Sequence, residues 1–296
     1  MKIKAIFFIY ILLCTGQFIR AQGLLDLINA NNSEEVYPVS ATFKGTRILI
    51  GHSVETRKAR TLEVSSHSRF WNTMDESSQA FIADRVNTRF GLEYGVSDNF
   101  TAGVGASTFD GFFDAFSKYR LLQQTANSEE RPLSITLFQN ATYRSKQFKE
   151  IPRDELIGRF SFVSQVLLAR KFTRKFSLQI TPSYIHHGAV GGPEDPLNQF
   201  AVGFGARYKL GGHLSVASEY YYVANTLESI DTFGPFAIGL NWELSDLFLQ
   251  FMLTNSRYLV EDSIITQNRL NFNFRNGNLH FGFNATYIIH FKKRNK

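Results

Sequence analysis

The stretch FAVGFGARYKL, residues 200–210, decides the fold class of this chain, because its side chains alternate in character. The apolar positions are Phe200, Val202, Phe204, Ala206, Tyr208 and Leu210. The positions between them are small or charged and include Arg207 and Lys209. Successive side chains of a β-strand point to opposite faces, so the stretch predicts a strand with one apolar face and one polar face.

The same two-residue period returns along the chain in segments separated by turn residues, without helical periodicity between them. We expect about fourteen strands, with twelve as the next choice. The alternation is weakest in the first two segments. The expected strands are Arg47–Val54, Leu62–Phe70, Val86–Val96, Phe100–Ala106, Phe113–Leu121, Leu133–Tyr143, Phe160–Leu168, Phe176–Tyr184, Phe200–Leu210, Leu214–Tyr222, Phe236–Trp242, Leu247–Leu253, Leu270–Phe274 and Leu279–Phe291.

Composition separates a membrane barrel from a soluble β-sandwich or lipocalin-like barrel, whose strands also alternate. The chain has 29 Phe and 12 Tyr, and bulky apolar residues occupy one face of nearly every expected strand. In a soluble fold that face points into a core of limited volume, whereas lipid accepts apolar side chains of any size. We therefore expect an all-β fold, a transmembrane antiparallel up-and-down β-barrel of about 12 to 14 strands, in the outer membrane.

The N-terminus is typical of a secretory signal peptide. Lys2 and Lys4 precede the apolar run Ala5–Leu13, and Arg20 ends the stretch too early for a membrane-spanning helix. Cleavage after Ala21 would remove the only cysteine of the chain. We expect a signal peptide at 1–21, an N-terminal lead-in at 22–46, a transmembrane β-barrel at 47–291 and a polar C-terminal tail at 292–296.

Two features of this scheme stay open. The stretch GLLDLINANN, residues 23–32, is either a simple lead-in or a short amphipathic helix that docks a partner. With fourteen strands, the tight turns at Ser97, Gly211, Ser245 and Asn276 fall outside the cell and the long loops fall in the periplasm. The usual rule for outer-membrane barrels is the reverse, so the side that carries the long loops is undecided.

Three motifs indicate a family. They are ATFKGTRILIGHSVET at 41–56, NTRFGLEYGVSDNFTAGVGAS at 87–107 and FSKYRLLQQ at 116–124. Together they resemble a family of outer-membrane β-barrel proteins of the Bacteroidota. The resemblance implies the barrel fold and its location. It implies no activity and no catalytic or binding residues, because no biochemical function is established for that family.

The polar face of the expected strands carries charges of both signs. The candidates for lining the lumen are Arg69, Arg89, Glu93, Lys118, Arg120, Arg207, Lys209, Glu219, Arg269 and Arg275, and the same row holds Glu63, His67 and Glu243. Charges on neighbouring strands can pair and stiffen the wall. Because basic residues outnumber acidic ones, the row can also form a constriction that favours anionic solutes. The sequence allows both a wall of paired charges and a basic constriction.

Catalysis, metal binding and nucleic-acid binding have weak support. None of the 7 histidines accompanies a serine motif such as G-x-S-x-G, so we expect no enzyme, no catalytic residue and no cofactor. His186 and His187 are adjacent on an expected strand and point to opposite faces, which favours a polar loop beside Asp195 over a metal site. The net charge of +6 is spread along the chain, and we expect no nucleic-acid partner.

The leading functional hypothesis is a porin-like barrel that passes or binds a small solute through a polar, mildly basic lumen. Its expected partners are outer-membrane lipid and a small anionic solute. The alternative is a non-conducting accessory barrel on which an exported periplasmic protein docks. An open lumen would favour the first hypothesis, and a lumen filled by paired charges would favour the second.

Overall fold

The computed structural model describes residues 36–39, 41–73, 83–109, 111–126, 130–146, 156–273 and 278–291. The expected signal peptide, the stretch 23–32 and the tail 292–296 lie outside these residues. Within the described part of the chain, no helix is long and apolar enough to span a membrane.

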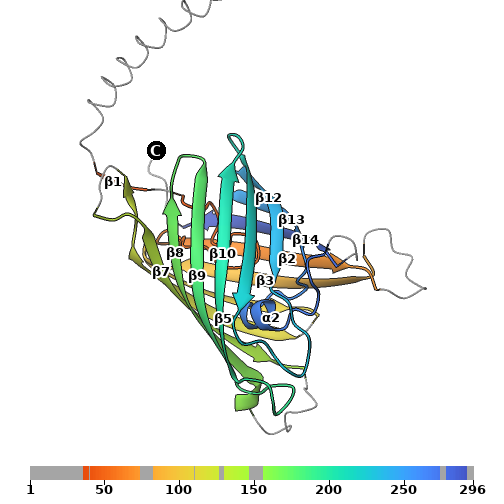
Figure 1. The fold of residues 1–296 in the computed structure, drawn as a ribbon. Coiled ribbons are helices and arrows are strands. Elements are labelled where there is room, and N and C mark those ends of the chain that lie inside the picture. Colours follow the sequence, from red (N-terminus) through yellow and green to blue (C-terminus); the bar gives the residue numbers. More distant parts are fainter. Residues whose placement is uncertain are drawn as a thin grey trace, which may run out of the picture. The chain divides into compact units, whose positions relative to one another are not determined.

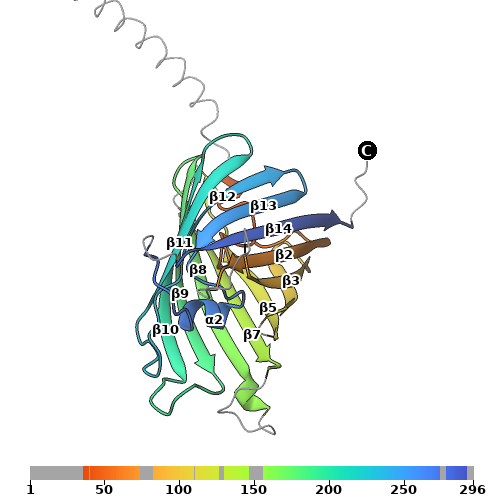
Figure 2. The ribbon, with the colours of Figure 1, turned by 90° about the vertical axis from the view of Figure 1, so that its right-hand side faces the viewer.

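Twelve antiparallel strands form a closed barrel (Figure 1). Each strand pairs with its neighbours along the chain, and Figure 2 shows β14 between β13 and β2, where the last strand closes the barrel on the first. The strands are β2 (Thr61–Trp71), β3 (Arg85–Gly95), β4 (Phe100–Ser107), β5 (Phe112–Leu122), β7 (Ser134–Arg144), β8 (Phe160–Lys171), β9 (Phe176–His187), β10 (Asn198–Lys209), β11 (Leu214–Val223), β12 (Phe236–Leu244), β13 (Leu247–Thr254) and β14 (His280–His290). The predicted antiparallel up-and-down barrel is confirmed, with the smaller of the two expected strand numbers.

The alternation that predicted the barrel also predicted its faces. On β10, Phe200, Phe204 and Tyr208 are 56%, 49% and 48% exposed, whereas Arg207 is 6% exposed. The outward side chains continue across the sheet, since Phe204 is paired with Ile180 on one side and with Tyr220 on the other. The apolar residues therefore form a continuous outer surface suited to lipid, and the polar residues point inward.

Two expected strands are wrong. Residues 47–54 form an isolated bridge between Arg47 and His52 instead of a strand, and they are buried on all sides. Of Leu270–Phe274, the described residues 270–273 contain no strand. Both segments are short, and in the first the apolar residues Ile48, Leu49 and Ile50 are consecutive, which breaks the two-residue period.

The connections at the two ends of the barrel differ in length. At the end where β2 begins and β14 ends, four connections are tight, 96–99, 172–175, 210–213 and 245–246, and the fifth, 123–133, is longer. The opposite end carries the connections 72–84, 108–111, 145–159, 188–197, 224–235 and 255–279. The Phe291 amide donates to the Arg60 carbonyl oxygen at 3.1 Å, so the barrel starts and finishes at the end with the tight turns.

This arrangement explains why the sequence left the side of the long loops undecided. Counting Arg47–Val54 as a strand inverted the direction of every later strand. With that segment removed, the turns at Ser97, Gly211 and Ser245 share an end with both barrel termini. The expected tight turn at Asn276 falls within residues 274–277, outside the described residues.

Three smaller elements complete the described fold. Strands β1 (Tyr37–Pro38) and β6 (Thr125–Ala126) form a two-stranded antiparallel sheet of their own. The short helices are η1 (Ile157–Arg159) and α2 (Glu261–Thr266).

The pairing of β8 with β9 is interrupted at Pro182, whose ring nitrogen has no hydrogen to donate to the ladder.

Candidate functional site

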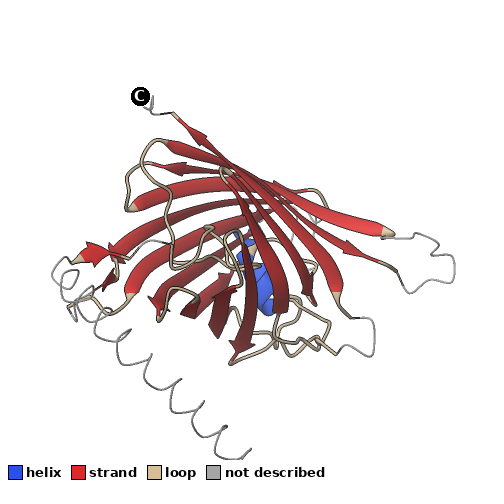
Figure 3. Ribbon diagram, turned by 90° about the horizontal axis from the view of Figure 1, so that it is seen from above, coloured by secondary structure: helices blue, strands red, loops and turns tan. Residues whose placement is uncertain are grey.

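The interior of the barrel is occupied by residues 41–56, here called the lumen loop. Its centre is a tight hairpin, in which the Ser53 amide donates to the Thr46 carbonyl at 2.8 Å and the Ile48 amide to the Gly51 carbonyl at 3.0 Å. The loop is the same stretch as the first of the three motifs in the sequence. Figure 3, a view from above, shows α2 and loop segments among the strands.

Two charged wall residues hold the backbone of the lumen loop. The Lys118 ammonium on β5 donates to the carbonyl oxygens of Thr46, Ser53 and Glu55 at 2.7, 3.0 and 3.2 Å. The Glu219 carboxylate on β11 accepts from the amides of residues 49, 50 and 51 at 2.7, 2.7 and 3.2 Å. Hydrogen bonds to charged groups contribute about 1.5–3 kcal/mol each, so both residues anchor the loop.

Neutral wall side chains add further hydrogen bonds to the loop. Gln179 on β9 accepts from the Val54 amide and donates to the His52 carbonyl, both at 2.8 Å. Three more side chains donate to loop carbonyls: Thr136 to Val54 at 2.7 Å, Gln250 to Ile48 at 2.6 Å and Asn284 to Leu49 at 3.0 Å. With Lys118 and Glu219, these contacts come from six strands around the barrel, which places the loop near its axis.

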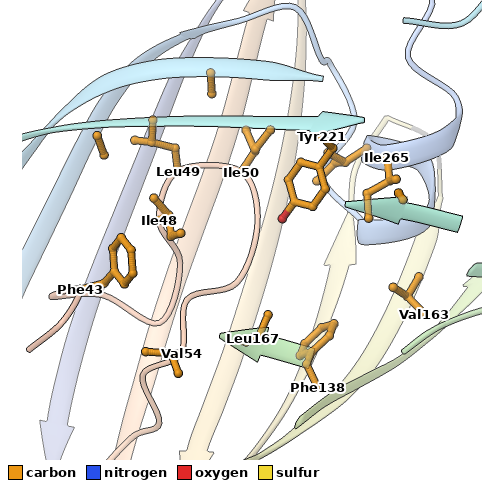
Figure 4. Packing of buried hydrophobic residues seen from close by; sticks show 14 of the residues in the cluster. Phe43, Ile48, Leu49, Ile50, Val54, Phe138, Val163, Leu167, Tyr221 and Ile265 are labelled. Carbon is orange, nitrogen blue, oxygen red and sulfur yellow. The ribbon is translucent and has the colours of Figure 1, made fainter. Parts of the chain in front are cut away.

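The lumen loop also brings its own apolar core into the barrel (Figure 4). Phe43, Ile48, Leu49, Ile50 and Val54 are at most 2% exposed. They form one cluster with inward side chains of the wall that include Phe138, Leu167 and Tyr221. The His52 ring lies against the rings of Phe116 and Phe138, with centroids 4.7 and 4.3 Å away. Each buried aliphatic side chain contributes about 1.5–3 kcal/mol, so the loop is held by packing as well as by polar contacts.

One position of the loop requires glycine. A Cβ atom at Gly51 would overlap the Tyr221 hydroxyl oxygen and lie 2.9 Å from a Glu219 carboxylate oxygen. The backbone at Gly51 therefore reaches the wall only because it has no side chain.

A second segment enters the barrel from the end with the long connections. Residues 255–268, here called the helical segment, contain α2, all of whose residues are buried. Glu261 forms an ion pair with Arg47 at 2.7 Å and lies 3.1 Å from the His52 imidazole. The lumen loop and the helical segment thus meet inside the barrel through buried charges, and together they obstruct the lumen.

The structure gives several of the predicted lumen residues a partner of opposite charge. Arg89 forms a bidentate contact with Asp114 at 2.8 and 2.5 Å. Arg207 contacts Glu243 at 2.7 Å, and Arg57 forms an ion pair with Glu63. These pairs follow the interpretation in which charges of the polar face neutralise one another.

The other predicted residues lie in different surroundings. Arg69 is buried and donates to the Asn284 side chain at 2.9 Å, and Arg120 lies near the barrel end beside Glu55 at 3.2 Å. Glu93 is buried directly opposite Glu63, and its carboxylate has no hydrogen-bond partner among the described residues. Lys209 is half-buried near a tight turn. Arg269 is exposed at the end with the long connections, and Arg275 lies outside the described residues.

A cavity of about 460 Å³ lies at the end with the long connections, above the helical segment. Its cationic lining residues are Arg144, Lys146, Arg159 and Arg269, and its acidic ones are Asp195 and Asp262. Although partial burial acts in the opposite direction, hydrogen bonds from the Ser229 hydroxyl and from the Ser229, Glu228 and Gly192 amides keep the pKa of Asp195 below its ordinary value. The Asp195 carboxylate therefore fastens the surrounding loops.

The two adjacent histidines, His186 and His187, were considered above as a metal site. His187 is buried and points inward, within 3.3 Å of the Ser161 and Thr266 hydroxyls, whereas His186 is on the outer face beside Asn198. Among the described residues, no three histidine, cysteine or acidic side chains gather in a way that could hold a metal ion.

The partners that make the lumen site were not predicted from the sequence. Asp114, Gln179, Gln250 and Asn284 occupy inward positions of expected strands, so the alternation contained the signal to find them. The lumen loop had a weaker signal, the apolar run from Ile48 to Ile50. Nothing local in the sequence indicated that Lys118 and Glu219 bind this run, because the contacts join residues 72 and 170 positions apart.

A family model described as "Membrane bound beta barrel domain (DUF5777)" matches residues 43–289, a range that includes most of the lumen loop. No curated protein matches the chain. Among solved structures, the chain is similar to the KdgM porin, with 8% identity, a TM-score of 0.48 and coverage of 78% of this chain and 99% of that chain. It is also similar to OmpF of Salmonella typhi in complex with daunomycin, with 8% identity, a TM-score of 0.38 and coverage of 77% of this chain and 96% of that chain. For the CymD monoaromatic hydrocarbon channel, the identity is 9% and the TM-score 0.38, with coverage of 79% of this chain and 89% of that chain.

Proposed function

This chain belongs to the family of membrane-bound β-barrel domains (DUF5777), and we propose that it is a gated channel for a small solute. Its location is the outer membrane, as the sequence predicted. The lumen loop is its gate, and solute passes when the loop leaves the interior. From the sequence, we also propose a secretory signal at 1–21 and an origin in the Bacteroidota.

One observation carries the proposal: the lumen loop is attached to the wall without being part of it. Its contacts are side chains such as Lys118, Glu219 and Gln179 reaching its backbone, whereas the strands are held by their own closed ladder. Displacement of the loop would therefore break no hydrogen bond between the barrel strands. A barrel that is closed by a separable segment has the parts that a gate needs.

The position of the barrel termini supports an orientation. Outer-membrane barrels have short turns in the periplasm and longer loops outside the cell. Applied here, this rule places the tight turns and both ends of the barrel in the periplasm, so the lumen loop enters from the periplasmic side. The helical segment then enters from the cell surface.

Conductance in planar bilayers tests the gate. The wild-type protein is expected to be closed at low voltage and to open briefly at higher voltage or in mild urea. Lys118→Met and Glu219→Ala each remove three hydrogen bonds to the loop and should raise the frequency of opening. Lys175→Ala, which changes an exposed basic residue in a tight turn, is the matched control and should behave as wild type.

The second candidate is the non-conducting accessory barrel that docks an exported periplasmic protein. The buried contacts of Arg47 and His52 with Glu261 favour it, because they fasten the loop to the helical segment. In that case the wild type and both loosened variants stay silent in bilayers although they fold. That result would overturn the gated channel.

A further inference from the structure

The cavity above the helical segment has the properties of a binding site for a small molecule. Its volume of about 460 Å³ falls within the roughly 300–1,000 Å³ typical of small-molecule sites. It is lined by apolar side chains, including Phe112, Leu227 and Tyr258, and by the charged groups described above. Such a mixture of an apolar wall with a few polar groups is typical of ligand pockets.

The charges of the cavity favour an anion. Four basic side chains line it, and one of the two carboxylates, Asp195, is already saturated by four hydrogen bonds from its own loops. Arg144 is held in place, with its guanidinium 4.9 Å from the centre of the Phe112 ring and donating to Gln267 at 3.1 Å. Arg159 is fixed by a 3.0 Å hydrogen bond to the Ser145 carbonyl. Lys146 and Arg269 are exposed and can turn toward a ligand.

The other carboxylate of the cavity, Asp262, has an oxygen atom that lacks a hydrogen-bond donor in the part of the chain that the structure describes. Asp262, on α2, is 2% exposed, and its Oδ1 atom has no hydrogen-bond partner among the described residues. Its Oδ2 atom has only a 3.3 Å contact with the Ser263 hydroxyl. A buried carboxylate oxygen without a donor is costly, and a hydroxyl group of a ligand would satisfy it.

We infer that this cavity binds a small hydroxylated organic anion, whose acidic group contacts Lys146 and Arg269 and whose hydroxyl group donates to Asp262. This inference names the solute class of the proposed function and depends on it only for the later passage of the solute. The site also has a route to the gate, because Asp262 is adjacent to Glu261, which binds Arg47 and His52 of the lumen loop.

Isothermal titration of the full folded barrel in detergent tests the site without any flux. The probes are gluconate, hexanoate and glucose, which share a six-carbon chain. Gluconate has charge and hydroxyl groups, hexanoate has charge alone and glucose has hydroxyl groups alone. Gluconate is expected to bind at least about tenfold more tightly than either of the others, a difference of about 1.4 kcal/mol. Equal or undetectable binding of all three would overturn the inference.

Variants separate the two halves of the site. The double variant Lys146→Ala, Arg269→Ala should weaken gluconate about tenfold or more, whereas Lys175→Ala at the opposite end should not. Asp262→Ala should abolish the preference for gluconate and strengthen hexanoate, because a negative charge is removed. Asp262 is buried, so the exposed Arg269→Ala variant tests the anion site even if Asp262→Ala does not fold. Unchanged gluconate affinity in the basic variants would contradict the assignment.

Failure of the site and failure of the gate have different signatures. If gluconate does not bind but the loosened variants open in bilayers, the gated channel stands and this site is wrong. If gluconate binds but no variant conducts, the barrel is a binding protein and the gated channel is wrong.

Discussion

At the residue scale, inward polar side chains of the barrel wall reach backbone atoms of the lumen loop. Lys118 and Glu219 lie on β5 and β11 and act on the loop in complementary ways, one as a donor to carbonyls and the other as an acceptor of amides. The polar face of the barrel wall is therefore used to bind a segment of its own chain. Outward residues have the separate task of meeting lipid.

Glu219→Ala should loosen the lumen loop while leaving the barrel folded. It leaves three buried amides without an acceptor, and each such loss costs about 1–3 kcal/mol. Trypsin cleavage after Arg47, which is buried in the wild type, should become faster, as measured by mass spectrometry. Glu219→Gln keeps an acceptor oxygen and should be cut more slowly than the alanine variant. Equal resistance of all three proteins would mean that Glu219 does not hold the loop.

Phe204→Arg should destabilise insertion, because it places a charge on the lipid face near the middle of β10. The cost of arginine at that depth is roughly 2–4 kcal/mol. Arg207→Ser changes an inward residue of the same strand and should leave the heat-modifiable folded band intact. Its partner Glu243 still has Lys44 as an ion-pair partner at 3.5 Å. If both variants lost the folded band to the same extent, the assignment of faces would fail.

At the scale of elements, strands were predictable and the segments inside the barrel were not. Alternation found all twelve barrel strands because each one separates lipid from a polar interior. The Arg47–Val54 segment also has polar and apolar residues, but it lies in an interior that offers partners on every side, so no two-residue period is imposed on it. Its mistaken inclusion inverted the predicted direction of the later strands. The cavity was missed because its residues come from four separate connections and strand ends.

The contact between the lumen loop and the helical segment should be measurable as a coupling. In a double-mutant cycle, Arg47→Met and Glu261→Gln should be non-additive in the free energy of unfolding, measured by urea denaturation in lipid vesicles. A coupling above about 0.5 kcal/mol is expected for two groups in direct contact. The pair Arg89→Met and Glu261→Gln is a stricter comparison, because Arg89 already has Asp114 as its partner. Additive effects for Arg47 and Glu261 would mean that the two segments do not support each other.

At the scale of the whole molecule, both ends of the barrel lie with the tight turns, which fits the usual topology of outer-membrane barrels. The sequence alone could not decide this, since the direction depends on the strand count. Two glycines are suited to a test. A side chain at Gly211 meets no atom within 4 Å, and one at Gly191 meets only ordinary contacts at 3.6 Å.

In intact cells, a membrane-impermeant maleimide should label Gly191→Cys and not Gly211→Cys. The cleavage proposed after Ala21 would take away Cys14, the only cysteine of the chain, and leave each mature variant with a single cysteine. Labelling of Gly211→Cys after the outer membrane is permeabilised shows that the cysteine is reactive. The opposite labelling pattern in intact cells would reverse the orientation and place the binding cavity in the periplasm.

Hydrogen–deuterium exchange of the wild-type protein in lipid vesicles measures whether residues 41–56 fill the lumen. The amides of Leu49, Ile50 and Gly51 donate to Glu219, and the Val54 amide donates to Gln179. We expect these amides to be protected far more than those of exposed turns and almost as much as those of the strands. Exchange as fast as in the exposed turns would contradict this expectation and would mean that the loop lies outside the barrel.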